Sequence, residues 1–251
     1  MGWRATDLSP CGHGARGRSY GYLSRMVNNM SKKDFPKFET AEVLAVAQAI
    51  FRLEGNKVNR GDFDFVTKKS SVSSKEQIIA HFNNTVPVMV TDQDREISKE
   101  IINHIQQRVI LDTLAGKNIS DFIGDVNNII CQETVHQFDL GRVVWAPKIY
   151  SDMVQRSSDQ EDIARYAITS TYIGLAKQKI EIDFFPIYSK FVRDYNCFRH
   201  LGHDGNGNLV GFLFKKPLGA GRIQARVKSQ SISKYNSNGK ITYLNYVKEQ
   251  V

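Results

Sequence analysis

The chain has 251 residues, of which 41% are hydrophobic and 24% charged, and its formal net charge is +8. This is the composition of a globular protein of one or two domains, and no run of about 18 apolar residues is present that could span a membrane. Three widely spaced cysteines, Cys11, Cys131 and Cys197, exclude a disulfide framework. Because no apolar segment follows the N-terminal arginines, as it would in a secretory signal, we expect a soluble cytoplasmic protein.

Residues 1–35 are rich in glycine and arginine, most clearly from Gly12 to Arg18, and show no apolar period. One interpretation is a translated leader, because Met30-Ser31-Lys32 resembles an ordinary start of a protein. The other is a flexible basic arm that contacts phosphates. In both cases we predict that residues 1–35 are disordered.

Residues 36–168 are predicted to form a mainly helical domain. Polar N-cap residues mark four helix starts, three of them with Gln, Asp or Glu three positions further on: Thr40, Ser74 (with Gln77), Thr91 (with Asp94) and Ser158 (with Glu161). Gly55 and Gly116 follow two of these helices and predict where they end. The apolar run Val143-Val144-Trp145, directly before Pro147, predicts a short strand.

The positive charge is confined to the C-terminal end of the chain. Residues 172–251 hold thirteen Lys and Arg against five acidic residues, which gives +8, whereas residues 1–171 hold 21 of each and balance to zero. A local excess of this kind attracts polyanions, nucleic acid first. We therefore look for the functional site in this last segment.

The same segment alternates apolar and polar residues with the period of β-strands. Five strands are predicted, over residues 180–192, 195–201, 209–214, 222–231 and 241–248. Pro186 interrupts the first strand and predicts a bulge or sharp bend, and residues 204–208 (Asp-Gly-Asn-Gly-Asn) predict a hairpin turn. Five strands, the first long and bent, favour a Greek-key barrel of the OB type over residues 169–251. The predicted fold class is therefore α+β.

Several short stretches of this segment carry a resemblance to a known family: Arg226-Val227-Lys228, Tyr235, Gly239-Lys240-Ile241-Thr242 and residues 244–248, with Tyr172-Ile173-Gly174 and residues 205–210 upstream. They resemble the OB-like, single-stranded-DNA-binding module at the C-termini of bacteriophage replication proteins. The likeness covers the last third of the chain, and its central hairpin has Gly211-Phe212 and no tryptophan. It implies a role in phage DNA replication, recombination or repair, in the host cytoplasm. The neutral first domain would then bind a replication enzyme or another copy of the chain.

Single-stranded nucleic acid binds where cations follow the phosphates and aromatic rings stack on bases. With Ile223, Ala225 and Val227 facing the core, the alternating cations of the same strand face outward. We expect the nucleic-acid interface to comprise Tyr195, Arg199, Phe212, Phe214, Arg222, Arg226, Lys228, Tyr235 and Lys240. Binding would have little sequence preference, and the choice between DNA and RNA stays open. The alternative is a structural or adaptor protein whose barrel binds a protein partner, because such barrels serve many functions.

Motifs for catalysis or metal binding are weak. Cys197, His200 and His203 have ligand-like spacing, but a structural zinc needs a further ligand, and a strand would not point all three side chains the same way. No nucleophile, phosphate-loop or dinucleotide motif occurs. Asp62 and Asp64 would share one strand face and allow a third hypothesis, a magnesium-dependent nuclease, although a solvated strand face is the simpler interpretation. The sequence therefore favours a binding protein over an enzyme, with no catalytic residues, metal or cofactor.

Overall fold

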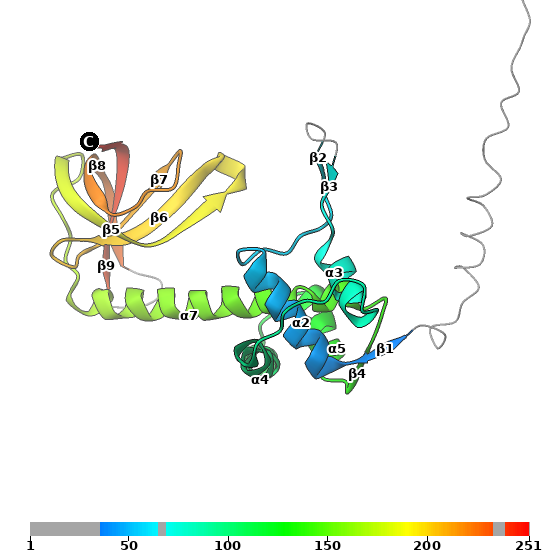
Figure 1. The fold of residues 1–251 in the computed structure, drawn as a ribbon. Coiled ribbons are helices and arrows are strands. Elements are labelled where there is room, and N and C mark those ends of the chain that lie inside the picture. Colours follow the sequence, from blue (N-terminus) through cyan, green and yellow to red (C-terminus); the bar gives the residue numbers. More distant parts are fainter. Residues whose placement is uncertain (1–35, 65–68, 233–238, 251) are drawn as a thin grey trace, which may run out of the picture. The chain divides into compact units, whose positions relative to one another are not determined.

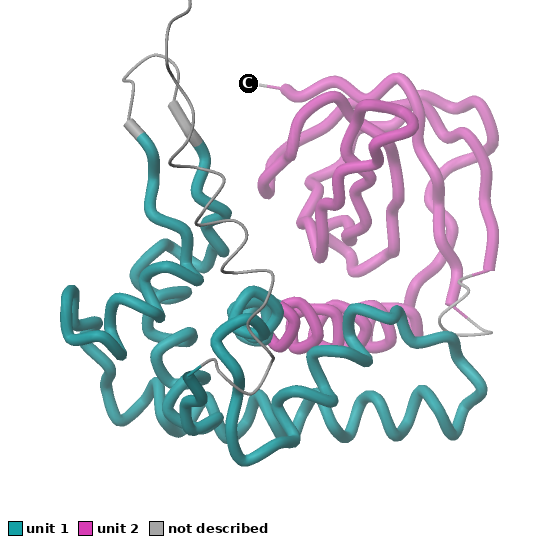
Figure 2. The backbone as a smooth tube through the Cα atoms, turned by 90° about the vertical axis from the view of Figure 1, so that its right-hand side faces the viewer, with its two compact units in different colours: residues 1–148 teal, residues 149–251 magenta. Residues whose placement is uncertain are grey.

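The computed structural model describes residues 36–64, 69–232 and 239–250. The chain divides into two compact units, unit 1 (residues 1–148) and unit 2 (residues 149–251), shown in Figure 2. Unit 1 is mainly helical and unit 2 contains a closed five-stranded barrel, which confirms the predicted α+β fold. The segment 1–35, for which we predict disorder, lies outside the described residues.

Unit 1 is built around the helix α2 (Thr40–Leu53), which is buried on nearly all sides from Val43 to Phe51. A helix that is apolar around its whole circumference forms the interior of a domain. Around it lie α3 (Ser74–Phe82), α4 (Asp92–Leu114) and α5 (Asp121–Ile130), which are labelled in Figure 1, and the short α6 (Leu140–Val143). Two small antiparallel pairs complete the unit, β1 (Lys37–Glu39) with β4 (Thr134–His136) and β2 (Phe63–Asp64) with β3 (Lys69–Ser70).

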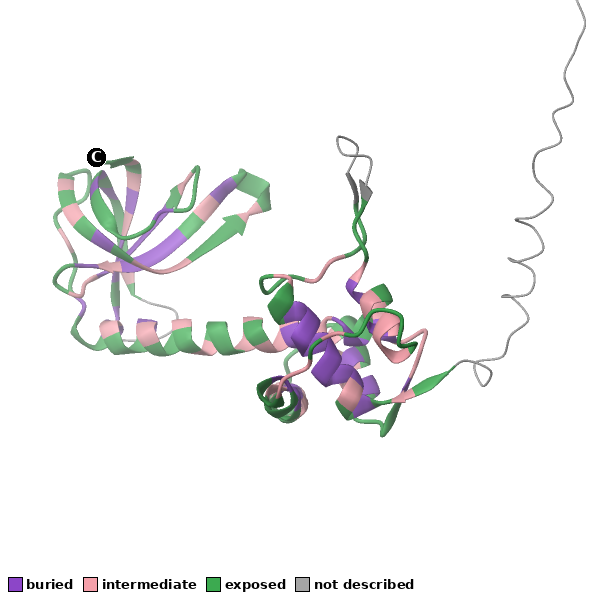
Figure 3. Cartoon of the chain, viewed as in Figure 1, coloured by how far each residue is buried: buried purple, intermediate pink, exposed green. Residues whose placement is uncertain are grey.

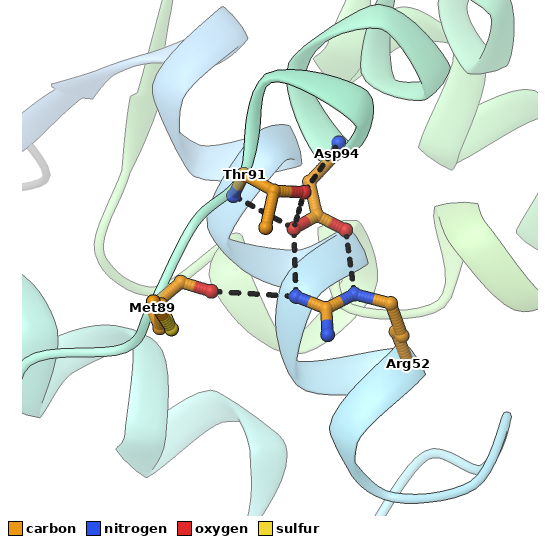
Figure 4. Close-up of polar contacts among 4 residues, drawn as sticks. All are labelled: Arg52, Met89, Thr91 and Asp94. Carbon is orange, nitrogen blue, oxygen red and sulfur yellow. Dashed lines mark hydrogen bonds and ion pairs between the residues drawn. The ribbon is translucent and has the colours of Figure 1, made fainter.

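An ion pair connects α2 to the start of α4 (Figure 4). The Arg52 guanidinium donates to both carboxylate oxygens of Asp94, at 3.0 and 2.9 Å, and to the Met89 carbonyl at 3.4 Å. Asp94 also completes the predicted capping box with Thr91. Burial raises the pKa of the Asp94 carboxyl, but the hydrogen bonds from Arg52 and Thr91 outweigh it, so the pKa lies below its ordinary value. The Asp94 side chain is 1% exposed, and it stays ionised because these donors surround it.

Two of the predicted helix starts are shifted by one residue. The box expected at Ser74 and Gln77 is formed by Ser73 and Glu76, because Ser73 has the extended backbone that a cap requires. Thr40 is the first residue of its helix, after the N-cap Glu39, and its hydroxyl bonds the Gln132 carbonyl. Gly55 and Gly116 follow their helices with positive φ, as predicted.

The segment 143–169 differs more from the prediction. No strand forms at Val143-Val144-Trp145, since α6 ends there and the long helix α7 (Ala146–Thr169) begins. Pro147 is in the first turn of α7, where its missing N–H would have no helical partner in any case. The predicted helix start at Ser158 is also wrong, because Ser158 and Glu161 are interior residues of α7.

Unit 2 contains the five strands of the barrel: β5 (Lys179–Val192), β6 (Cys197–Asp204), β7 (Leu209–Phe214), β8 (Gly221–Ile232) and β9 (Lys240–Glu249). Their order around the closed sheet is β5-β6-β7-β9-β8, and β7 and β9 are parallel while the other pairs are antiparallel. This is the arrangement of an OB-like barrel. A single 3-10 turn, η2 (Arg193–Tyr195), connects β5 to β6.

The predicted bulge in the first strand is confirmed, because the β5–β6 register shifts between Pro186 and Tyr188. The bend brings β5 very close to β6 at Gly202. A Cβ atom at this position would lie 2.2 Å from the Phe185 carbonyl oxygen and 2.7 Å from the Phe184 ring. Only glycine fits there, so Gly202 permits the curvature that closes the barrel.

The barrel core contains Phe184, Val210, Phe212 and Leu244 together with the predicted inward residues of β8, Ile223, Ala225 and Val227. The resulting alternation of buried and exposed residues can be followed along β8 in Figure 3.

The last turns of α7 close one end of the barrel, where Ile163 and Ala167 pack on Leu201, Leu209 and Ile241. Just after the helix, the Ser170 hydroxyl donates to the Lys240 carbonyl and accepts from the Leu209 N–H. The predicted boundary at residue 168 coincides with the end of α7, whereas the compact units divide within its first turn.

Candidate nucleic-acid interface

A groove of about 510 Å³ crosses the barrel, and we call it the tyrosine groove. Its lining comes from η2 and from β6, β7, β8 and β9, together with the last residue of β5. The lining residues are Val192, Tyr195, Arg199, Gly211, Phe212, Leu213, Lys228, Ser229, Tyr243, Leu244, Asn245 and Tyr246. Three tyrosines and two cations are among them, and no carboxylate is.

The tyrosines present ring surface to solvent. Tyr195, in η2, is 71% exposed and Tyr246, in β9, is 74% exposed. The ring of Tyr243 lies against Gly211 of the neighbouring strand β7, where a Cβ atom would approach it to 3.0 Å. Because Gly211 has no side chain, the Tyr243 ring can pack closely against the backbone of β7. Exposed rings beside a floor of this kind are suited to stacking with planar ligands.

The two cations of the tyrosine groove are Arg199, on β6, and Lys228, on β8. Both are exposed, and neither forms an ion pair within the described part of the chain. The β8–β9 register shifts between Val227 and Ser229, so Lys228 is an extra residue without a partner opposite it. A bulge of this type redirects a side chain, and here the redirected residue lines the groove.

Tyr246 has a backbone conformation that tyrosine rarely adopts. Its φ is +52°, in the left-handed region that favours glycine. The cause is a second register shift, between Gln224 and Arg226, which leaves one extra residue on β9 opposite Ala225. An L-residue in this region costs about 1–2 kcal/mol. Because strained residues cluster at functional sites, an exposed tyrosine held this way marks the rim of the groove as a candidate contact surface.

The structure brings three of the nine predicted interface residues together with open side chains, namely Tyr195, Arg199 and Lys228. Arg226 lies across Tyr246, with its guanidinium 5.6 Å from the ring centroid, and does not line the groove. Arg222 pairs with Glu181 at 3.0 Å, and Lys240 lies over the Tyr172 ring at 5.6 Å. Tyr235 lies outside the described residues.

The two predicted phenylalanines face the interior instead of the solvent. Phe212 is 4% exposed and stacks on His200 with ring centroids 5.0 Å apart, and Phe214 packs at the edge of the same core. β7, which contains both residues, is apolar on both faces, so its sequence does not indicate which face is exposed to solvent. The open face of β7 carries Leu213. We therefore do not include Phe212 and Phe214 in the interface.

Three contributors to the groove were missed by sequence reasoning: Tyr243, Asn245 and Tyr246. Asn245 has a side-chain oxygen that is buried and without a hydrogen-bond partner in the structure. The sequence shows that the last strand contains two aromatic residues, Tyr243 and Tyr246. What was not visible is the bulge that places them, because a left-handed tyrosine has no sequence signature.

His200 and His203 take part in contacts within the barrel. The Ser189 hydroxyl lies 2.7 Å from His200 Nδ1, and the Lys216 carbonyl lies 3.2 Å from Nε2. Burial lowers the pKa of His200, against the hydrogen bond to Lys216. His203 stacks between the rings of Tyr166 and Phe185, at 4.0 and 5.3 Å. Both rings therefore have structural partners.

The residues Asp204 to Asn208 form the hairpin turn that the sequence predicts. One Asp204 oxygen accepts the backbone N–H groups of Asn206 and Asn208, and the other accepts the Asn208 side chain. Among the described residues, no three His, Cys, Asp or Glu side chains come together as a metal site. Asp62 is exposed, and the side chain of Asp64 lies outside the description.

Unit 1 has a pocket of about 480 Å³ that also contains cations and aromatic rings. Here, however, the groups contact one another. The Arg60 guanidinium lies 4.9 Å from the Trp145 ring centroid, and Phe122 meets the same ring edge-on at 6.3 Å. The tyrosine groove is the better candidate because Tyr195 and Tyr246 are largely exposed beside its two cations, whereas the arginine of the unit 1 pocket lies over its tryptophan ring.

No protein-family model, no curated protein and no solved structure matches this chain. Within the described residues, no helix has the length and the apolar composition needed to cross a membrane. The geometry and charge of the barrel are therefore the basis on which a function can be proposed.

Proposed function

We propose that the barrel binds single-stranded nucleic acid, with DNA as the first candidate, in the tyrosine groove. The observation that carries the proposal is the lining itself, three tyrosines and two cations without a carboxylate. Stacking on an aromatic side chain contributes about 1–3 kcal/mol per base and tolerates any sequence, and cations that follow the backbone add a salt-dependent term. In OB-like barrels the face of the second and third strands is where oligonucleotides bind. Here those strands are β6 and β7, which supply Arg199 and Leu213.

Each group in the groove has a defined role in this proposal. Tyr195 and Tyr246 offer exposed rings to bases, and the Tyr243 ring, which lies against Gly211, forms part of the floor. Arg199 and Lys228 contact the phosphates that flank the stacked bases. Since nothing in this set reads base edges specifically, little sequence preference is expected. Following the resemblance of the C-terminal strands, we assign such binding to phage-type DNA replication, recombination or repair.

The test is fluorescence anisotropy of labelled oligo-dT with the full chain, at low and moderate salt. The variant pair Arg199→Gln and Lys228→Gln removes both groove cations. Its matched control, Lys177→Gln with Lys215→Gln, removes the same charge from exposed lysines of unit 2 that do not line the groove. We expect the first pair to lower the slope of log affinity against log salt by about 1.4, at about 0.7 per phosphate contact.

Binding that is equally weakened by the control pair would assign the effect to overall charge and not to the groove. No binding by the unmodified protein at low salt would reject the nucleic-acid proposal. The adaptor alternative would then gain support, because an apolar protein interface depends little on salt.

A further inference from the structure

A second, smaller groove shares Tyr246 with the tyrosine groove, and we call it the cation groove. It has a volume of about 250 Å³ and is lined by Lys179, Gln224, Ala225, Arg226, Tyr246 and Lys248. Three of these six residues carry a positive charge and none carries a negative one. Tyr246 lines both grooves, so the two are adjacent along the surface of the barrel.

Two of the three cations, Lys179 and Arg226, are opposite each other, and the third, Lys248, is on the strand that neighbours Arg226 on its other side. Lys179 of β5 is directly opposite Arg226 of β8 in the strand register, and Gln224 of β8 is opposite Lys248 of β9. Like charges directly opposite each other across a strand pair are destabilising. Within the described residues, none of the three forms an ion pair. A bound anion would relieve this repulsion.

The nearest acidic residues on these strands have other partners. Glu181, two positions after Lys179, accepts the Arg222 guanidinium at 3.0 Å, and Glu249, next to Lys248, pairs with Lys216. These two carboxylates are thus neutralised by cations outside the cation groove, and the positive charge of the groove remains available to a ligand. Its lining also has only one aromatic ring, Tyr246, in contrast to the tyrosine groove.

We propose that the cation groove binds the phosphodiester backbone of the same strand whose bases occupy the tyrosine groove. The strand would pass from one groove to the other at Tyr246, whose ring contacts the Arg226 guanidinium at 5.6 Å. This inference rests on the proposed function, and it adds a second contact region with a different chemistry: bases stack in the first groove and phosphates are neutralised in the second. A strand long enough to reach both is needed for full affinity.

The experiment measures binding of oligo-dT of increasing length, from about 4 to about 16 nucleotides, the range of site sizes known for OB folds. The full chain is compared with the variant pair Lys179→Gln and Lys248→Gln and with the control pair Lys177→Gln and Lys215→Gln. We expect the first pair to bind the shortest oligonucleotides like the unmodified protein, and to lose the gain in affinity that length provides. With long oligonucleotides its salt slope should be lower by about 1.4.

A second measurement uses long oligonucleotides in which one half of the linkages are uncharged methylphosphonates. For one of the two placements, affinity should fall to that of a short strand, and the variant pair should then cause no further loss. An equal loss at every length, or no loss at any length, would overturn the inference while leaving the proposed function intact. Absence of binding by the unmodified protein at all lengths would instead reject the proposed function itself.

Discussion

In unit 1 four of the five described arginines pair with carboxylates, whereas in unit 2 the cations of the two grooves pair with none among the described residues. The unit 1 pairs include Arg52 with Asp94, Arg95 with Glu42, Arg108 with Asp112 and Arg142 with Asp125 and Asp139. Residues 36–148 hold thirteen basic and fifteen acidic residues, so partners are plentiful there. In the barrel segment, bases outnumber acids by eight. Of its five acids, Glu181 and Asp183 pair with Arg222, Glu249 pairs with Lys216, and Asp204 accepts hydrogen bonds within its turn.

The aromatic residues show the same contrast. In unit 1 Phe38 stacks on Phe82, and Trp145 is covered by Arg60 and Phe122. In the barrel, Tyr195 and Tyr246 are largely exposed. Paired charges and covered rings stabilise a fold, while unpaired charges beside exposed rings provide interactions for a ligand. This difference between the units supports the proposal that the barrel is the binding unit, and four changes test the proposal.

The largest effect is expected when a stacking ring is removed. Tyr195→Ala or Tyr246→Ala should each weaken oligo-dT binding about 10- to 100-fold, since a stacked base contributes about 1–3 kcal/mol. Anisotropy titration at fixed salt measures the change. The matched control is Tyr172→Ala, which removes a ring from the same unit outside both grooves. A loss of similar size in the control would contradict the assignment of binding to the grooves.

Removing a carboxylate that pairs with an arginine in unit 1 should lower the stability of the protein and leave oligonucleotide binding unaltered. Asp94→Ala removes the buried partner of Arg52 and one half of a capping box, and should lower the free energy of unfolding by about 2 kcal/mol. Asp112→Ala, on the exposed side of the same helix, should cost only about 0.5 kcal/mol. Urea denaturation followed by tryptophan fluorescence is suited to this, because Trp145 lies in unit 1. Equal costs for the two variants would show that the Arg52–Asp94 contact does not stabilise unit 1.

Tyr246→Gly should separate stability from binding within the barrel. Glycine adopts the left-handed conformation without the steric penalty, so the barrel should gain up to about 1 kcal/mol in unfolding free energy. Binding should weaken as in Tyr246→Ala, because the ring is lost in both. Tyr246→Ala keeps the strained backbone and is the control for the stability gain. If glycine were no more stable than alanine, the strain would not be a property of this position.

The smallest effect is a pH dependence of barrel stability. Burial lowers the pKa of His200 below its ordinary value of 6.5, so the unfolded chain takes up a proton there more readily than the folded one. The contribution of neutral His200 to the free energy of unfolding is therefore complete above pH 6.5. It declines as the pH falls from 6.5 toward the lower pKa of His200 in the folded state. Thermal melts between pH about 5 and about 8 measure this slope. His200→Gln should flatten this slope, because it removes the buried imidazole.

The sequence predicts the barrel well because its strand period, its turns and Pro186 all agree on one topology. Arg226 and Lys228 have the same strand parity, and alternation alone places them on one surface. The bulge at Lys228 separates them into different grooves. Register shifts depend on tertiary fit between β8 and β9, so local patterns cannot indicate them.

Errors in the helical part have a similar origin. Ser158 and Glu161 form a plausible capping pair, yet α7 continues through them because its later residues Ile163 and Ala167 pack on the barrel. The prediction of an exposed Phe212 is wrong because both faces of β7 are apolar: one meets the core and the other is covered in part by Tyr243 and α7. In each case packing between distant segments outweighs the local pattern.

The closure of the barrel end by α7 has a consequence for how this part of the protein opens. Amide protons in the last two turns of α7 should exchange with solvent only when the barrel opens, because Ile163, Ala167 and Ser170 are fixed to β7 and β9. The exposed middle turns of the same helix should exchange earlier and independently. A fragment that begins at residue 170 would leave Leu201, Leu209 and Ile241 facing water. The smallest portion able to fold as a barrel therefore begins before Ile163.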